Sequence, residues 1–247
     1  MAGASGLYVA LILKDLGIPY KILEARDRVG GRLFTHTFED KTGAPYNYYD
    51  VGAMRFPEIL PMSRVFHLFH CPPLNSEGIE LSKKLTRYYF TGSNTLLSYN
   101  GVTVPRTAVP PGDPFKADAV INHPKAHLYI AAGYKAIMDD VIAPFATRLL
   151  DDLQNNTDDG WKYMMEFDHY SMRAYMSITY RPDSKLGLPD APLPTDVVNW
   201  CETFDKSTGS YDRALSETVL QAIAFGWQPA TEGQEQTEWW CIECVFL

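Results

Sequence analysis

The sequence is poor in the features that mark membrane-spanning and nucleic-acid-binding proteins. It contains no run of about 18 apolar residues, the length that a transmembrane helix requires. Its 22 basic side chains are outnumbered by 30 acidic ones, for a net charge of −8, and no dense Lys/Arg cluster stands out along the chain. Because nucleic acids and anionic membranes select a positive face, we expect no nucleic-acid partner and no membrane span.

Cysteine is also scarce. Cys71, Cys201, Cys241 and Cys244 are too few for a disulfide framework in 247 residues, so we expect mostly buried thiols. The last two have the C-x-x-C spacing of zinc sites and redox dithiols, which leaves that alternative open, but no second pair accompanies them. The closely spaced histidines likewise lack an acidic ligand at metal spacing. We therefore predict no metal site.

A secretory leader is also not evident. The apolar run at residues 7–13 (LYVALIL) has no basic residue before it, and Lys14-Asp15 follow at once. We interpret this run as a buried helix. With no signal peptide in this chain the compartment stays unknown, and the cytoplasm is the default expectation.

The N-terminal pattern predicts a turn, a helix and a strand. Residues 5–16 are a helix candidate, since Gly17 stands where helices commonly end in a left-handed turn and Pro19 prevents continuation. Residues 20–23 fit a short strand that ends at Glu24. These are the second and third parts of a β-α-β unit.

Further along, short strands give way to helices. We predict strands at 34–38 and 46–51 around a turn at 41–43, a helix at 59–71, hairpin strands within 85–104 with turns at 91–94 and 100–101, and a loop at 105–114. The second half is mainly helical, with helices at 134–153 and 161–176 and an irregular stretch at 181–195. The last helix is predicted at 211–227, with Ser210 as N-cap, Asp212 in the first turn, and one face formed by Tyr211, Leu215, Val219 and Ala222.

A group of residues near the N-terminus has dinucleotide-binding spacing. Gly3-Ala4-Ser5-Gly6 supplies the last two glycines of a G-x-G-x-x-G fingerprint, with Met1 in the place of the first. Gly3 lets backbone approach a pyrophosphate, and the helix N-terminus attracts its charge. Glu24 follows at the end of the predicted strand, from which a carboxylate accepts hydrogen bonds from ribose hydroxyls. The alternative is a glycine-rich helix cap with a solvated glutamate.

The next motif favours flavin over nicotinamide. In Arg28-Val-Gly-Gly-Arg32 the glycine pair permits close backbone approach, and Arg32 can neutralise a phosphate. The string GASGL…ILEARDRVGGR resembles the N-terminal signature of the flavin-containing amine oxidases, which include monoamine, polyamine and L-amino-acid oxidases. The resemblance implies FAD as cofactor, and a nicotinamide-dependent enzyme is the less favoured alternative.

A later loop narrows the resemblance. Gly52-Ala-Met-Arg55-Phe-Pro57 is similar to a flavin-contacting loop of the family, most of all in L-amino-acid oxidases, and the stretch 202–213 is similar to fungal members. The resemblance implies that Arg55 binds the substrate carboxylate, for which a planar guanidinium is well suited. A surface arginine or a structural salt bridge is the alternative reading of Arg55.

The resemblance implies a full set of site residues. Those expected to bind the cofactor are Gly3, Ala4, Ser5, Gly6, Glu24, Ala25, Arg26, Gly30, Gly31, Arg32, Gly52, Ala53, Met54 and Arg55. No catalytic residue can be assigned. The implied reaction is FAD-dependent oxidative deamination of an L-amino acid or other primary amine, with oxygen as co-substrate and hydrogen peroxide as product. The oligomeric state stays open, with a homodimer as one option.

We therefore expect an α+β chain with two parts. Residues 1–57 would form an incomplete, Rossmann-like α/β domain that binds FAD, and residues 58–247 a mixed helical and antiparallel substrate domain. Compared with the family pattern, the sequence lacks the first strand, the first glycine and the segment that normally follows 239–243. We therefore expect that the chain is truncated at both ends. The alternative function is a catalytically inactive fragment that acts as a binding partner.

Overall fold

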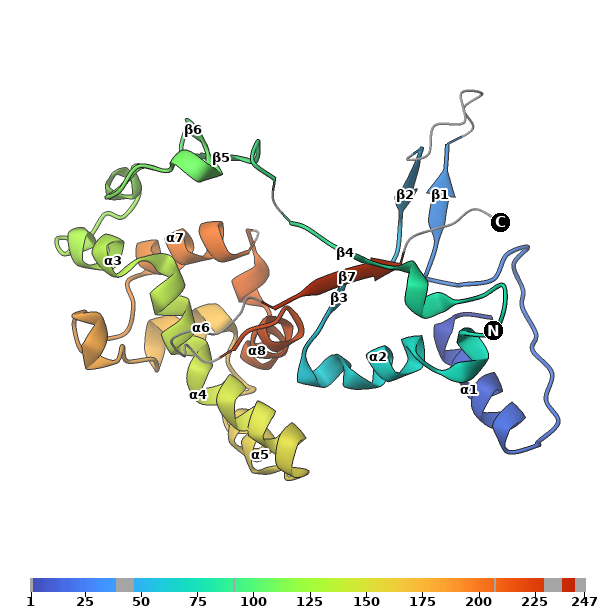
Figure 1. The fold of residues 1–247 in the computed structure, drawn as a ribbon. Helices are drawn as coiled ribbons and strands as arrows, with labels where there is room; N and C mark the ends of the chain where they lie inside the picture. The colour runs from blue at the N-terminus through green and yellow to red at the C-terminus, as the bar shows by residue number, and fades with distance from the viewer. Residues whose placement is uncertain (1, 39–46, 91, 207, 229–236, 243–247) are drawn as a thin grey trace. The chain divides into compact units, whose positions relative to one another are not determined.

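The computed structural model describes residues 2–38, 47–90, 92–206, 208–228 and 237–242 (Figure 1). It combines helices with small antiparallel sheets in two compact units. Unit 1 comprises Met1–Phe56, Val65–Tyr88 and Glu238–Leu247, and unit 2 comprises Pro57–Arg64 and Tyr89–Thr237. The first segment of unit 1 ends near the predicted boundary at residue 57, but unit 1 also takes in two later segments. That the units bind cofactor and substrate respectively stays a prediction.

Unit 1 begins with helix α1 (Ala4–Asp15), which confirms the predicted first helix. Gly17 adopts the left-handed conformation with a φ of +66°, and the N–H of Ile18 donates to the carbonyl of Leu13 at 2.9 Å. These features end the helix as the Gly-x-Pro pattern predicts. α1 buries only Ala10 and leaves Leu7, Val9 and Ile12 exposed, so the expectation that this helix is buried is wrong for the described residues.

The strand predicted at residues 20–23 is wrong. The structure assigns no strand there, and Tyr20, Ile22 and Leu23 are exposed. A strand exists only when a neighbour supplies its hydrogen-bond ladder, and no strand of the described residues lies beside this segment. Backbone pairing in this region is instead an isolated parallel bridge between Gly3 and Gly30.

Two small sheets complete unit 1. β1 (Thr35–Thr37) pairs antiparallel with β2 (Tyr48–Asp50), with Thr35 opposite Asp50, which confirms the predicted hairpin; its turn at 41–43 lies outside the described residues. A second sheet has the order β3 (Phe56–Pro57), β7 (Trp239–Ile242), β4 (Leu85–Arg87), with β4 and β7 antiparallel. The hairpin predicted around the turn at 91–94 is therefore wrong. β4 finds its partner about 150 residues later in the chain, a non-local pairing that local turn signals do not encode.

Helix α2 (Ser63–Phe69) follows a 3₁₀ turn at Leu60–Met62, and together they confirm the helix predicted at 59–71. Further 3₁₀ turns are Pro72–Leu74, Leu81–Lys84, Arg106–Ala108, Ala117–Ala119, Ser184–Leu186 and Ser210–Asp212. In unit 2, β5 (Leu96–Tyr99) and β6 (Val102–Pro105) form a hairpin around Asn100 and Gly101, both at positive φ. This confirms the predicted second turn.

In the described residues of unit 2, six α-helices pack around a common core. They are α3 (Ala126–Ala132), α4 (Tyr134–Asn155), α5 (Asp159–Met165), α6 (Met172–Ile178), α7 (Thr195–Asp205) and α8 (Leu215–Ala224). α4 is the spine, because α5, α7 and α8 all pack on it. It contributes Ile137, Val141 and Phe145, which are completely buried. Their spacing of four residues places them on one face of the helix.

Two helix predictions in unit 2 need correction. The helix predicted at 161–176 is interrupted, and α6 starts anew where the Ser171 hydroxyl accepts a hydrogen bond from the N–H of Ala174 at 3.1 Å. α8 starts at Leu215 with Ala214 as N-cap, whereas Ser210 and Asp212 belong to a 3₁₀ turn. The predicted buried face is confirmed for Leu215, Val219 and Ala222, whereas Tyr211 is buried but lies in the 3₁₀ turn outside α8.

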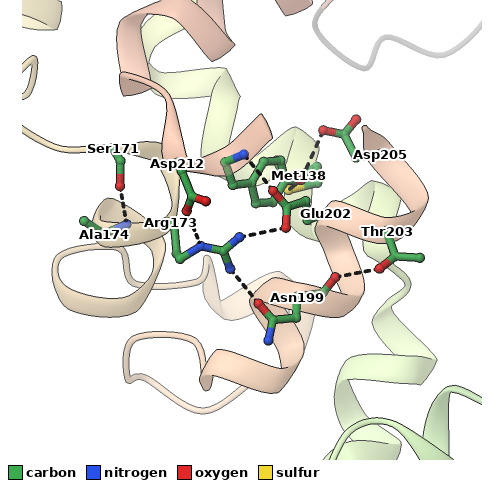
Figure 2. A network of polar contacts seen from close by, with 10 residues as sticks. Met138, Ser171, Arg173, Ala174, Asn199, Glu202, Thr203, Asp205 and Asp212 are labelled. Carbon is green, nitrogen blue, oxygen red and sulfur yellow. Dashed lines mark hydrogen bonds and ion pairs between the residues drawn. The ribbon is translucent and has the colours of Figure 1, made fainter. Parts of the chain in front are cut away.

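A polar network explains why the 3₁₀ turn is separate from α8. Figure 2 shows the guanidinium of Arg173 between Asp212, Asn199 and Glu202, to which it donates hydrogen bonds at 2.7, 2.6 and 2.7 Å. The other oxygen of Glu202 accepts from the backbone N–H of Tyr211 at 2.8 Å. The stretch 202–213, which resembles fungal sequences, thus contributes to the internal framework of unit 2.

Candidate functional site

A cleft of about 1200 Å³ lies in unit 1. Three segments line it: the start of α1, residues 23–34, and residues 51–53 after β2. Its lining contains Gly3, Ala4, Ser5, Gly6, Glu24, Ala25, Arg26, Gly30, Gly31, Arg32, Gly52 and Ala53. These are all the residues expected to bind the cofactor except Met54 and Arg55. Folding therefore brings together residues that are spread over 50 positions of the sequence.

In the lining of the cleft, the turn at Gly3 contacts the turn at Gly30-Gly31. The N–H of Gly30 donates to the carbonyl of Ala2 at 2.7 Å, and this bond forms the Gly3–Gly30 bridge. Gly31 has a φ of +59°, and a Cβ atom on it would lie 3.3 Å from the Cα of Gly3. The absence of side chains lets the two turns touch and leaves their backbone exposed to a ligand.

Gly52 approaches the segment that follows the Gly30-Gly31 turn even more closely. A Cβ atom at this position would lie 1.7 Å from the carbonyl oxygen of Arg32. No other residue fits there without movement of the backbone. The three segments of the cleft are therefore held at their present separations by glycine.

The N-terminus of α1 faces the cleft without a side-chain cap. Gly3 is the N-cap, and the first helical bond runs from the N–H of Leu7 to the carbonyl of Gly3 at 3.0 Å. The N–H groups of Ala4, Ser5 and Gly6 consequently have no partner within the helix. Together with the positive end of the helix dipole they favour an anion.

Charged side chains in the lining give the cleft a positive balance within an acidic chain. Arg26, Arg28 and Arg32 line it, against the single carboxylate of Glu24. Arg26 and Arg32 are exposed, and neither side chain makes a hydrogen bond or ion pair within the described ranges. Free guanidinium groups beside an open helix N-terminus suit a pyrophosphate.

Glu24 is a fixed acceptor in the cleft. Its Oε2 accepts a hydrogen bond from the N–H of Ala2 at 2.6 Å, and its Oε1 accepts from the N–H groups of Ala25 and Arg26 at 3.0 and 3.1 Å. The bonds from Ala2 and Arg26 lower the pKa of Glu24 to about 2. The carboxylate is ionised at neutral pH, as a ribose-binding acid needs to be. The donor set of the cleft therefore fits the adenosine diphosphate part of a dinucleotide.

The structure does not bring the two remaining expected residues to the cleft. Met54 and Arg55 are not among the residues that line it. Arg55 is exposed, and its guanidinium carbon lies 5.9 Å from the ring centroid of Tyr88 in a cation–π contact. Its role in binding a substrate carboxylate stays a prediction.

Sequence reasoning missed five residues of the lining, which are Leu23, Arg28, Leu33, Phe34 and Val51. Arg28 lies in the motif that pointed to flavin, but its side chain had been given no role there. Leu23 directly precedes the acid, Val51 directly precedes Gly52, and Leu33 and Phe34 directly follow Arg32. Adjacency to the motif residues is therefore the signal that could have found them.

Metal chemistry finds no support in the described residues. They contain no group of three His, Cys, Asp or Glu side chains that could hold an ion. Cys201 is buried, whereas Cys71 and Cys241 are half-buried, so the thiols are less buried than expected; Cys244 lies outside the described residues. No helix within the described ranges has the length and apolarity needed to cross a bilayer.

Comparison with known proteins assigns the chain to a family. Residues 4–187 match the family model of the flavin containing amine oxidoreductases. L-amino-acid oxidase 4 of Hebeloma cylindrosporum is 44% identical over 257 aligned positions, which cover 98% of this chain and 38% of the relative. The cytotoxic L-amino-acid oxidase of Amanita phalloides is 52% identical over 143 positions, which cover 58% of this chain and all of the relative. The chain thus spans about two fifths of the length of the Hebeloma protein.

Proposed function

We propose that this chain, which belongs to the flavin-containing amine oxidoreductase family, binds FAD in the cleft of unit 1 and serves the oxidation of an amine. Unit 1 would then be part of an FAD-binding fold, and unit 2 would belong to the substrate side. Two relatives are named as L-amino-acid oxidases, which supports an L-amino acid as the substrate.

The observation that carries the proposal is the composition of the cleft. Backbone N–H groups at the start of α1, the guanidinium groups of Arg26 and Arg32, and the ionised carboxylate of Glu24 lie around one cavity. The first two groups suit the phosphates of FAD, and the third suits the ribose hydroxyls.

The proposed reaction is oxidative deamination. Bound FAD would supply the two-electron oxidation of the amine to an imine, with oxygen reduced to hydrogen peroxide, and water would hydrolyse the imine to a keto acid. The contribution of the protein is to bind the cofactor and to orient the substrate. For an amino acid, the orienting group would be Arg55, whose guanidinium can hold a carboxylate with two parallel hydrogen bonds.

A second candidate function is that of a catalytically inactive binding partner. The observation that favours it is the apolar surface of unit 1, where Leu7, Val9 and Ile12 of α1 and Ile22 and Leu23 after it are exposed. Val9, Ile22 and Leu23 line a common hollow, and exposed apolar surface of this kind is typical of association sites. Arg55 also lies outside the lining of the cleft.

The purified 247-residue protein distinguishes these functions. We expect it to retain FAD through gel filtration, with flavin absorbance in the protein peak, and to release hydrogen peroxide with L-amino acids but not with their D-enantiomers. Arg55→Met should then raise the KM for amino acids more than the KM for amines that lack a carboxylate. Retention of FAD without peroxide would favour the inactive partner, and a colourless protein that takes up no added FAD would refute cofactor binding.

A further inference from the structure

We infer that Arg28 is a positioning residue of the cleft: it fixes the Gly30-Gly31 turn and so orients the neighbouring backbone and Arg32 toward the ligand. This inference rests on the proposed dinucleotide function. It separates Arg28 from Arg26 and Arg32, although all three arginines line the same cleft.

The contacts of Arg28 are directed at the turn and at the strand that follows it. Its Nη1 donates to the carbonyl of Gly31 at 3.0 Å and lies 3.4 Å from the carbonyl of Val29. The guanidinium carbon lies 4.1 Å from the ring centroid of Phe34, a cation–π contact. Arg28 thereby ties the turn to the residue directly before β1.

The turn needs such a tie because its backbone is permissive. Gly30 and Gly31 have φ values of +96° and +59°, a conformation that glycine adopts easily and also leaves easily. A further bond within the turn, from the N–H of Leu33 to the carbonyl of Gly30 at 3.0 Å, fixes one carbonyl. The bond from Arg28 fixes the next carbonyl and thereby the direction in which the chain enters Arg32.

The three arginines differ in whether their guanidinium groups already make contacts within the chain. Arg26 and Arg32 are exposed and make no side-chain hydrogen bond or ion pair within the part of the chain that the structure describes. Arg28 is half-buried, with one nitrogen used by the turn and its face covered by Phe34. The planar fork explains the residue type, because the ammonium of lysine cannot bond a carbonyl and stack on a ring in the same way.

The test measures ADP binding by calorimetry and backbone amide exchange by mass spectrometry on the full chain. Arg28→Met and Arg28→Lys should both weaken ADP about tenfold, with the dependence on ionic strength unchanged, because no phosphate contact is lost. Arg32→Met is the matched comparison. It should weaken ADP and also reduce the dependence on ionic strength, and Arg32→Lys should restore much of both.

Two further measurements test the position of Arg28 rather than its charge. Phe34→Leu should weaken ADP by removing the stacking face, Phe34→Tyr should not, and the Arg28→Met/Phe34→Leu double variant should bind no worse than Arg28→Met alone. Without ligand, amide exchange of residues 29–33 should speed up in Arg28→Met and stay unchanged in Arg32→Met.

The outcomes separate this inference from the proposed function. Full affinity in Arg28→Lys together with reduced ionic-strength dependence in Arg28→Met would make Arg28 a direct phosphate ligand and overturn the inference. Unchanged exchange of residues 29–33 in Arg28→Met would overturn it as well. If the wild-type chain binds no ADP, the proposed function fails, while the exchange experiment still decides whether Arg28 holds the turn.

Discussion

The cleft of unit 1 and the core of unit 2 are built by opposite means. α1, at the edge of the cleft, buries one of its 12 residues, whereas α4, in the middle of the core, buries eight of its 22. The cleft is shaped by glycines and backbone hydrogen bonds, and the core by large side chains such as Phe145 and Tyr211. The comparison teaches that the two units use different parts of the chain. Side-chain packing stabilises unit 2, whereas glycine residues in unit 1 let backbone segments approach closely around the proposed ligand site.

The largest expected effect comes from removing a core side chain. Phe145 is completely buried, and its ring lies 5.3 to 5.5 Å from those of Phe167, Tyr175 and Tyr163. Phe145→Ala should lower the free energy of unfolding by about 3–5 kcal/mol through lost burial and the cavity left behind. Urea unfolding followed by far-UV circular dichroism measures this change.

Leu153→Ala on the same helix is the control, because that side chain is 56% exposed. It should change the free energy of unfolding by no more than about 0.5 kcal/mol. Equal losses in the two variants would mean that α4 does not form the spine of the core, and the contrast between the two regions would be wrong.

A smaller effect is expected from adding one methyl group to the cleft. Gly52→Ala would place a carbon 1.7 Å from the carbonyl oxygen of Arg32, so the segments 31–33 and 51–53 must move apart. We expect at least tenfold weaker ADP binding, which is about 1.4 kcal/mol, by calorimetry.

Gly78→Ala serves as the matched substitution in unit 1. Unlike Gly52, this glycine has a positive φ, of +85°, but a Cβ atom on it meets nothing within 4 Å, and it is not part of the cleft. It should cost some stability through backbone strain and leave ADP affinity unchanged. If both variants lost affinity equally, the tight approach at Gly52 would not be what shapes the cleft.

The smallest expected effect concerns the acid of the cleft. Hydrogen bonds from the backbone of Ala2 and Arg26 lower the pKa of Glu24 from 4.5 to about 2. Because the folded-state pKa is the lower one, the stabilisation is fully present above pH 4.5 and is lost as the pH falls towards 2. Carboxyl-carbon NMR of the folded protein should show titration near pH 2, and a peptide of residues 21–27 should titrate near 4.5. A pKa near 4.5 in both would mean that Glu24 does not accept the backbone hydrogen bonds from Ala2 and Arg26.

Local signals predicted the elements that depend on near neighbours. Gly17 and Pro19 marked the end of α1, and Asn100-Gly101 marked the hairpin of β5 and β6. These signals are local, because glycine and asparagine tolerate a positive φ and proline cannot continue a helix. Elements that depend on distant partners were predicted wrongly. The apolar run 20–23 has no neighbouring strand among the described residues, and β4 pairs with β7 rather than with the next strand in sequence.

The final helix shows the same division within one segment. Its buried face followed from the spacing of Leu215, Val219 and Ala222, since periodicity is a property of the sequence. Its start did not, because Ser210 has the composition of an N-cap but the bond from the N–H of Tyr211 to Glu202 holds this segment in a separate turn.

By itself, the sequence determined the family and the chemistry of the cleft, because glycines, arginines and an acid at set spacings carry that information as residue types. The tertiary structure alone decided which of these residues meet. It placed Glu24 against Ala2, stacked Arg28 on Phe34 and left Arg55 outside the lining of the cleft. The physical reason is that residue type fixes what a side chain can bind, whereas contacts between segments depend on how closely their backbones can approach.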